Sequence, residues 1–346
     1  MLLTTVVGSY PQPGWLVKRD YLRDHLPPRV RDWDWWRLAE EFLPEAQNDA
    51  TIVAIHDQQQ AGIDIITDGE QRRESYSNYF ATTLDGVSID PPGKAIDRTG
   101  REVPVPLIVG PVGRRRPVAV GDVEFLRRHT DRPIKITLPG PFTMSQQAQD
   151  DHYGNPRKLA MDLARAVNEE MHDLAAAGAD VIQLDEPYME ARTEQALEYG
   201  IDAFNAALDG VQATKAIHIC CGYGHFVHEK GGKPHYTMLS ALRDTDVQQI
   251  SIEGAQPRLD PSILADLPDK TFIYGVIDLG TNEIETAEVV AERIREALQH
   301  TSPEQLQPAP DCGLKYLDRD VAYAKLVALV EGTRLVRREL GIDDTR

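Results

Sequence analysis

Residue types that bind metal ions recur at spacings that would bring them together. His218 and Cys220 lie in the apolar run 215–221, which is typical of a short buried strand. Residues two apart in a strand face the same side, so these two side chains point together. Zinc in proteins prefers imidazole nitrogen and thiolate sulfur, with carboxylate oxygen as a further ligand. Cys312, and Glu253 at the end of another strand-like run, would complete a tetrahedral set of zinc ligands.

A histidine and a cysteine two residues apart are more often part of a packed core, because free cysteine is among the most buried residue types. The functional interpretation is favoured because Ser9, Glu70, Asp185 and Asp278 also follow strand-like runs. Asp185 alone fits a helix N-cap, and Glu70 alone fits an ion pair. As a set, polar groups at the ends of six runs predict an active site.

Eight short β-rich runs alternate with helical segments, an order typical of a parallel α/β barrel with its active site at the carboxyl ends of the strands. We therefore predict a (β/α)8 TIM barrel, a single domain over residues 1–346 with elaborated loops. An open doubly wound sheet is less favoured, because no G-x-G-x-x-G follows the first run. The clearest helix spans 156–177. The predicted strands are 4–10, 63–67, 107–109, 134–138, 181–184, 215–221, 249–254 and 272–277.

The composition excludes several classes of protein. The net charge of -18 argues against nucleic acid or an anionic membrane surface as a partner, because phosphate binding requires clustered lysine and arginine. No apolar run approaches the ~20 residues of a membrane span. Three cysteines, two of them adjacent, do not form a disulfide framework. We expect a cytoplasmic protein whose cysteines are free for metal binding or catalysis.

Several motifs together resemble one enzyme family along nearly the whole chain. They are VVGSYPQ (6–12), DGE (68–70), LPGPFT (138–143), LDEP (184–187), HIC (218–220), IE (252–253) and PDCGLK (310–315). The chain resembles the catalytic C-terminal barrel of cobalamin-independent methionine synthase. The resemblance implies zinc held by His218, Cys220, Glu253 and Cys312. It also implies that homocysteine is bound by Val7, Gly8, Ser9, Glu70 and Asp185.

The chemistry of these residues agrees with the resemblance. Zinc lowers the pKa of a thiol until the nucleophilic thiolate prevails at neutral pH, so His218, Cys220 and Cys312 would be catalytic. The carboxylates of Glu70 and Asp185 suit the ammonium group of an amino-acid thiol. The hydroxyl of Ser9 and the amides of its turn suit the carboxylate.

Three positions depart from the folate-dependent members of the family. Those members carry a stacking Trp, a pterin-binding Glu and a proton-donating His where this chain has Gln147, Ala191 and Gly280. Release of an unprotonated pterin nitrogen requires a general acid, whereas cobalt(I) leaves without a proton. The pattern resembles the short "core" methionine synthases and predicts methylcobalamin or a corrinoid protein as the methyl donor. His225 or His228 is an alternative acid in the loop after the zinc strand.

Three other functions fit parts of the pattern. The first is methionine synthesis with methyltetrahydrofolate as the donor. The second is alkyl transfer to another thiol, as in epoxyalkane:coenzyme M transferases, with Arg72 and Arg73 binding a sulfonate. The third is a noncatalytic protein that binds a thiol or is stabilised by zinc. Ligands spread over distant strand ends argue against a structural zinc site.

Overall fold

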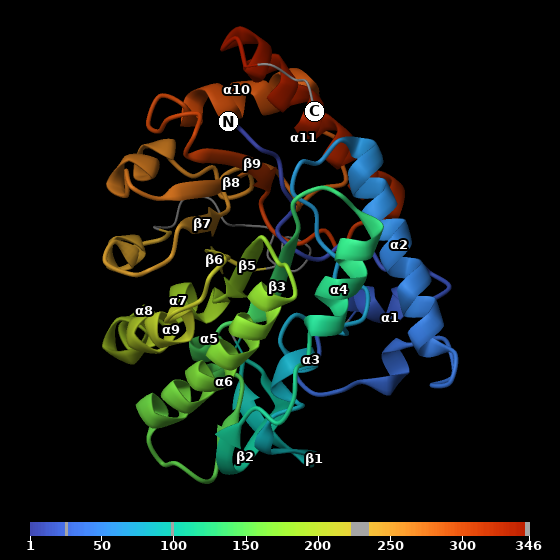
Figure 1. Ribbon diagram of the computed structural model, residues 1–346, viewed down its shortest axis with the longest axis vertical. Helices are drawn as coiled ribbons and strands as arrows, with labels where there is room; N and C mark the ends of the chain where they lie inside the picture. The colour runs from blue at the N-terminus through green and yellow to red at the C-terminus, as the bar shows by residue number, and fades with distance from the viewer. Residues whose placement is uncertain (25–26, 98–99, 223–234, 343–346) are drawn as a thin grey trace.

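The computed structural model describes residues 1–24, 27–97, 100–222, 235–342. Its central feature is a six-stranded parallel sheet in the order β3-β5-β6-β7-β8-β9 (Figure 1). Most of these strands are buried along their whole length, as the near-continuous apolar runs predict. The strands are β3 (Lys135–Pro139), β5 (Val181–Asp185), β6 (Thr214–Ile219), β7 (Gln249–Ile252), β8 (Thr271–Ile277) and β9 (Leu306–Pro310).

Two extended segments near the N-terminus complete the sheet into a ring. Thr5 and Ile65 form a parallel bridge, and Ile66 bridges Ile134 beside β3. On the other side, the backbone N–H of Thr5 donates to the carbonyl of Pro308 in β9 at 3.2 Å. Eight parallel segments therefore follow one another around a closed ring, and the predicted (β/α)8 fold class is confirmed.

Helices surround this ring on the outside (Figure 1). Two of the longest helices have capping residues of the types that are common at helix ends. Asn155 caps α6 by accepting from the N–H of Lys158, and Gly62 ends α2 with a φ of 94°. The longer helices are α2 (Leu43–Ala61), α4 (Val120–His129), α6 (Pro156–Ala176), α9 (Ile201–Leu208), α10 (Ala287–Ala297) and α11 (Arg319–Glu339).

One predicted barrel strand is wrong. Residues 107–109 lie in β2 (Glu102–Gly113), which pairs antiparallel with β1 (Asp85–Ile96) and parallel with the short β4 (Gln149–Asp150). This three-stranded sheet is separate from the barrel sheet and lies at the lower end of the molecule in Figure 1. The missing barrel strand is β9, whose two prolines hide it in the sequence.

The remaining elements are short and lie in the connections. The segment 15–36 contains α1 (Arg19–Asp24) and the 3-10 turn η1 (Trp33–Trp35), and it contributes Leu16, Val17, Trp35 and Trp36 to a small second core. Among the described residues, no helix is long and apolar enough to cross a membrane. The short elements are α1 (Arg19–Asp24), η1 (Trp33–Trp35), α3 (Asn78–Ala81), α5 (Pro141–Gln146), α7 (Pro187–Ala191), α8 (Thr193–Gln195), η2 (Ala196–Gly200), η3 (Leu239–Leu242) and η4 (Pro261–Asp266).

Candidate active site

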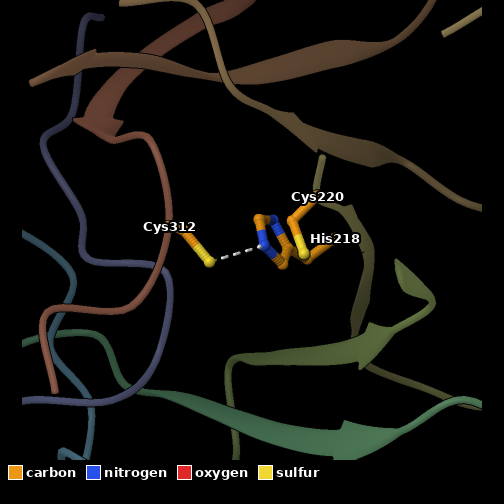
Figure 2. A group of neighbouring side chains, drawn as sticks. All are labelled: His218, Cys220 and Cys312. Carbon is orange, nitrogen blue, oxygen red and sulfur yellow. Dashed lines mark hydrogen bonds between the residues drawn. The ribbon is translucent and has the colours of Figure 1, made fainter. Parts of the chain in front are cut away.

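His218, Cys220 and Cys312 meet at the carboxyl end of the barrel (Figure 2). His218 lies in β6, Cys220 follows this strand, and Cys312 follows β9. One ligand atom from each lies within 4.8 Å of the others, and all three side chains are buried. The Nε2 atom of His218 is 3.5 Å from the Sγ atom of Cys312. The structure therefore brings together three of the four residues predicted to bind zinc.

The donor set and its surroundings fit a zinc ion. One imidazole nitrogen and two sulfurs are the ligands that zinc prefers. The Nδ1 atom of His218 shares a hydrogen bond of 2.9 Å with the hydroxyl of Ser251, so Nε2 is the nitrogen directed at the sulfurs. Metal-binding histidines usually have such a partner on the second nitrogen, which fixes the orientation of the ring. Ser251 lies in β7, two residues before Glu253, and their spacing in the sequence could have indicated that both face the cluster.

Glu253 is buried beside the cluster but is not one of its three members. Its Oε1 atom accepts a hydrogen bond of 2.8 Å from the backbone N–H of Cys221. Burial lowers the pKa of His218, but its hydrogen bond with Cys220 and the negative charges of Cys220, Asp185 and Glu253 raise it overall. Glu253 is thus close enough to act on His218, and its role as a fourth ligand stays a prediction.

Cys221 is turned away from the cluster, as strand alternation predicts. Its sulfur lies 3.4 Å from the hydroxyl of Tyr236, and burial raises the pKa of its thiol far above the ordinary value. The Tyr236 hydroxyl also accepts from the backbone N–H of Glu253 at 2.8 Å. Cys221 therefore belongs to the packing behind the cluster.

A pocket opens in front of the cluster, and all five residues predicted to bind homocysteine line it. These are Val7, Gly8, Ser9, Glu70 and Asp185. His218, Cys220 and Cys312 form part of the same wall. The remaining lining residues, which the sequence analysis did not single out, are Tyr76, Pro187 and Gly313. Side chains from at least five segments of the barrel thus face one small volume.

Glu70 occupies a constrained position in this pocket. Its φ of 54° places a non-glycine residue in the left-handed region, in the turn after residues 63–67. Its Oε1 atom accepts a hydrogen bond of 3.2 Å from the hydroxyl of Thr137. Burial raises the pKa of Glu70, whereas the positive charges of Arg73 and Lys315 lower it. The turn and these neighbours hold the carboxyl group beside Gly8.

Asp185 ends β5 and reaches the pocket from the other side. Its Oδ1 atom accepts a hydrogen bond of 2.8 Å from the Nε2 atom of Gln183. Burial raises the pKa of Asp185 to about 7, and the charge of His218 opposes this shift. Ser9 is held next to the Cys312 loop, where its carbonyl accepts from the N–H of Leu314 at 2.9 Å. An ammonium group between Glu70 and Asp185 would relieve the cost of burying two carboxylates.

The positions that depart from the folate-dependent pattern lie in different surroundings. Gln147 is buried, and its Nε2 atom donates to the hydroxyl of Tyr76 at 2.6 Å, so it holds an aromatic ring of the pocket. Ala191 is exposed at the end of α7, while the adjacent Glu190 accepts from the N–H of Tyr236 at 3.0 Å.

Two further predictions concern the loops at this end of the barrel. Asp278 follows β8, but it is not among the residues that line the pocket; its carbonyl accepts from Lys325 at 2.9 Å. Gly280 follows in the same turn, and its N–H donates to Asp278 at 2.7 Å. His225 and His228 lie outside the described residues.

A parallel barrel with a buried cluster of nucleophilic and ionisable groups at the carboxyl ends of its strands is the architecture of an enzyme. Residues 2–334 match the family described as the cobalamin-independent synthase catalytic domain. The chain is 37% identical over 348 residues to the methionine synthase of Saccharolobus solfataricus, covering 98% of this chain and 96% of that protein. It is 35% identical to the methionine synthase of Sulfolobus acidocaldarius, covering 98% and 94%.

A solved structure agrees with these relatives. It is a B12-independent methionine synthase from Shewanella sp. W3-18-1 in complex with selenomethionine, with a TM-score of 0.90 and 36% identity over 98% of this chain and 99% of that one. The chain belongs to the cobalamin-independent methionine synthase family, and it is a methyltransferase of the methionine synthase type.

The predicted methyl donor is wrong. Methylcobalamin or a corrinoid protein does not fit a family whose members act without cobalamin. The prediction rested on three absent side chains, and the absence of a residue at one aligned position does not show what other positions supply. Tyr76, held by Gln147, places an aromatic ring in the pocket from a different segment. A corrinoid protein was predicted as a partner only because it would supply the methyl group, so that prediction fails with the donor.

Proposed function

We propose that this chain transfers a methyl group from methyltetrahydrofolate to the thiol of homocysteine and forms methionine. The observation that carries the proposal is the shared pocket: the His218–Cys220–Cys312 cluster and two buried carboxyl groups line the same volume. A substrate that carries both a thiol and an ammonium group can contact both at once. The family without cobalamin supplies the reason for a folate donor.

We propose zinc as the metal, held by His218, Cys220 and Cys312, with Glu253 as the fourth ligand. Once bound, zinc would lower the pKa of a thiol beside it, so that the nucleophilic thiolate prevails at neutral pH. Ser251 would keep the imidazole of His218 in its binding orientation. The walls of the pocket exclude water from the cluster, because the three ligand side chains are at most 7% exposed.

The amino-acid end of homocysteine would lie between Glu70 and Asp185. Both carboxyl groups are buried, Glu70 accepts a hydrogen bond from Thr137, and Asp185 accepts one from Gln183. The turn that contains Val7, Gly8 and Ser9 would bind the substrate carboxylate through backbone N–H groups and the Ser9 hydroxyl. Two negative charges facing one ammonium group orient the substrate with its sulfur toward the cluster.

The structure argues against a coenzyme M acceptor, which would require free cations at the mouth of the pocket. Arg72 contacts Asn48 at 2.6 Å and Thr51 at 3.1 Å on α2. Arg73 donates to the carbonyl of Thr137 at 2.8 Å inside the barrel and is 1% exposed. Both arginines are committed to internal contacts.

Steady-state formation of methionine tests the proposal. Zinc-loaded protein should produce methionine from homocysteine and methyltetrahydrofolate, and removal of the metal by a chelator should abolish turnover. Methylcobalamin should not replace the folate donor. Turnover at the full rate after the zinc has been removed, or no methionine with any folate donor, would contradict the proposal.

A further inference from the structure

A buried ammonium group connects the loop of Cys312 to the turn of Glu70. Lys315 is 4% exposed, and its Nζ atom donates to the backbone carbonyls of Arg73 at 3.0 Å and Glu74 at 2.8 Å. The same atom lies 4.8 Å from the centroid of the Trp35 ring. Both hydrogen bonds go to neutral carbonyl oxygens, and among the described residues no carboxylate forms an ion pair with this lysine. Its full positive charge acts on the surrounding groups.

Arg73 provides a second cation in the same region. Its guanidinium donates to the carbonyl of Thr137 at 2.8 Å and to the Thr137 hydroxyl at 3.1 Å. That hydroxyl in turn donates to Glu70 at 3.2 Å. Arg73 also lies 3.7 Å from Asp68, which shares its charge. Arg73 therefore has an acidic partner in Asp68, whereas no such partner lies beside Lys315 in the part of the chain that the structure describes.

The nearest consequence of these charges is at Glu70. Burial raises the pKa of Glu70, and the charges of Arg73 and then Lys315 are the largest influences that lower it. Burial lowers the pKa of Lys315 to about 8, and the charge of Glu70 is the largest influence that opposes this. At neutral pH both groups can stay ionised because each stabilises the charge of the other.

We infer that Lys315 is a positioning residue that sets the specificity of the pocket: it keeps Glu70 a carboxylate, and the site therefore prefers a thiol that also carries an ammonium group. The inference rests on the proposed homocysteine acceptor. A neutral Glu70 would still occupy the pocket but would lose its attraction for the ammonium group. The sulfur end of the site should not change, because the side-chain contacts of Lys315 found within the described residues are with Arg73, Glu74 and Trp35.

Binding of two different thiols distinguishes an electrostatic role of Lys315 from a role in packing alone. Homocysteine and 4-mercaptobutanoate share the thiol, the chain length and the carboxylate, and only homocysteine has the amino group. The measured quantity is the ratio of their dissociation constants, with zinc content determined on the same samples. Lys315→Met removes the charge but keeps an apolar stem against Trp35. Lys315→Gln keeps an amide donor for the two carbonyls, and Lys315→Arg keeps the charge.

Lys270 supplies a matched control. Its Nζ atom also donates to two backbone carbonyls, those of Thr245 and Val247, both at 2.9 Å. It precedes β8 at the amino end of the strand, opposite the pocket. Lys270 is partly buried; Lys270→Met removes an ammonium group with the same kind of hydrogen-bond partners and should leave the preference for homocysteine unchanged.

The wild type should bind homocysteine more tightly than 4-mercaptobutanoate. Lys315→Met and Lys315→Gln should reduce this preference by roughly tenfold or more, which equals about 1.4 kcal/mol of lost attraction. Lys315→Arg should retain most of the preference, and zinc content should stay constant throughout. An unchanged ratio in the Gln variant, which is the informative one if the Met variant does not fold, would overturn the inference. A wild type without any preference would instead contradict the proposed homocysteine acceptor.

Discussion

A single methyl group at Gly8 should disable the amino-acid end of the pocket while leaving the metal cluster intact. A Cβ atom on Gly8 would lie 2.6 Å from the Oε1 atom of Glu70 and 2.9 Å from the Cγ2 atom of Thr137. Glu70 would have to move by about 0.8 Å to regain an ordinary contact of 3.4 Å. Thr137 cannot yield easily, because it is 1% exposed and its hydroxyl is held by Arg73.

The displacement breaks the hydrogen bond between Glu70 and the Thr137 hydroxyl and moves the carboxylate from its place beside the ammonium group. Loss of one buried charged contact costs on the order of 2–5 kcal/mol. Affinity for homocysteine should therefore fall between roughly 30-fold and a few thousand-fold. Zinc content should not change, because the three atoms nearest to the added Cβ belong to Glu70 and Thr137 rather than to the metal cluster.

Isothermal titration with homocysteine, together with metal analysis, measures both quantities for Gly8→Ala. Gly14→Ala is the control in the same segment, since its Cβ would meet only Arg19, at an ordinary distance of 3.8 Å. The control should bind homocysteine as the wild type does. Wild-type affinity in Gly8→Ala would refute the placement of the substrate beside Glu70, and loss of zinc in that variant would refute the separation of the two ends of the pocket.

Three further predictions concern the carboxyl groups of the pocket, the partner of His218, and a buried lysine. Glu70→Gln and Asp185→Asn should each weaken homocysteine binding by on the order of 2–5 kcal/mol with zinc retained, as measured by titration calorimetry; unchanged binding in both would point to a different thiol. Ser251→Ala removes the partner of His218 Nδ1, 2.9 Å away, and should lower zinc affinity by roughly 10–100-fold in a competition assay, whereas equal affinity would mean that the hydroxyl does not orient the ring. Burial lowers the pKa of Lys135 from 10.5 to about 7, and its Nζ has no hydrogen-bond partner among the described residues, so the folded state resists its charge. Lys135→Met should therefore stabilise the protein by about 1–4 kcal/mol at about pH 6, and the gain should shrink as the pH rises from 7 toward 10.5; a gain that is equal at about pH 6 and about pH 9.5 in urea unfolding would contradict the assignment.

The periodicity of the sequence was sufficient to predict most barrel strands but not which apolar runs belong to the barrel. The run that contains residues 107–109 is apolar and β-branched, and only tertiary pairing assigns it to the outer sheet with β1. β9 contains Pro308 and Pro310, which cannot donate to a ladder and are typical of loops. The carbonyl of Pro308 nevertheless accepts from Thr5, and this contact joins the ends of the ring.

Most residues of the pocket were predictable because they lie at or just after the end of a strand, and parallel strands end at one face of a barrel. Their partners were not, since Lys315, Thr137 and Gln147 act on the pocket through contacts that depend on distant segments. For Glu253, the position could be predicted but the contact could not. Its place at the end of β7 follows from the sequence, whereas its hydrogen bond to the N–H of Cys221 depends on how two neighbouring strand ends meet. The methyl donor was inferred from absent residues and was wrong.

Zinc content in a pair of adjacent cysteine variants tests the central claim most directly. Cys220 belongs to the cluster with His218 and Cys312, while Cys221 contacts Tyr236 behind it. Purified wild type should contain one zinc ion per chain, Cys220→Ser should lose almost all of it, and Cys221→Ala should retain it. Full zinc occupancy in Cys220→Ser, or loss of zinc in Cys221→Ala equal to that in Cys220→Ser, would contradict the assignment of the metal centre.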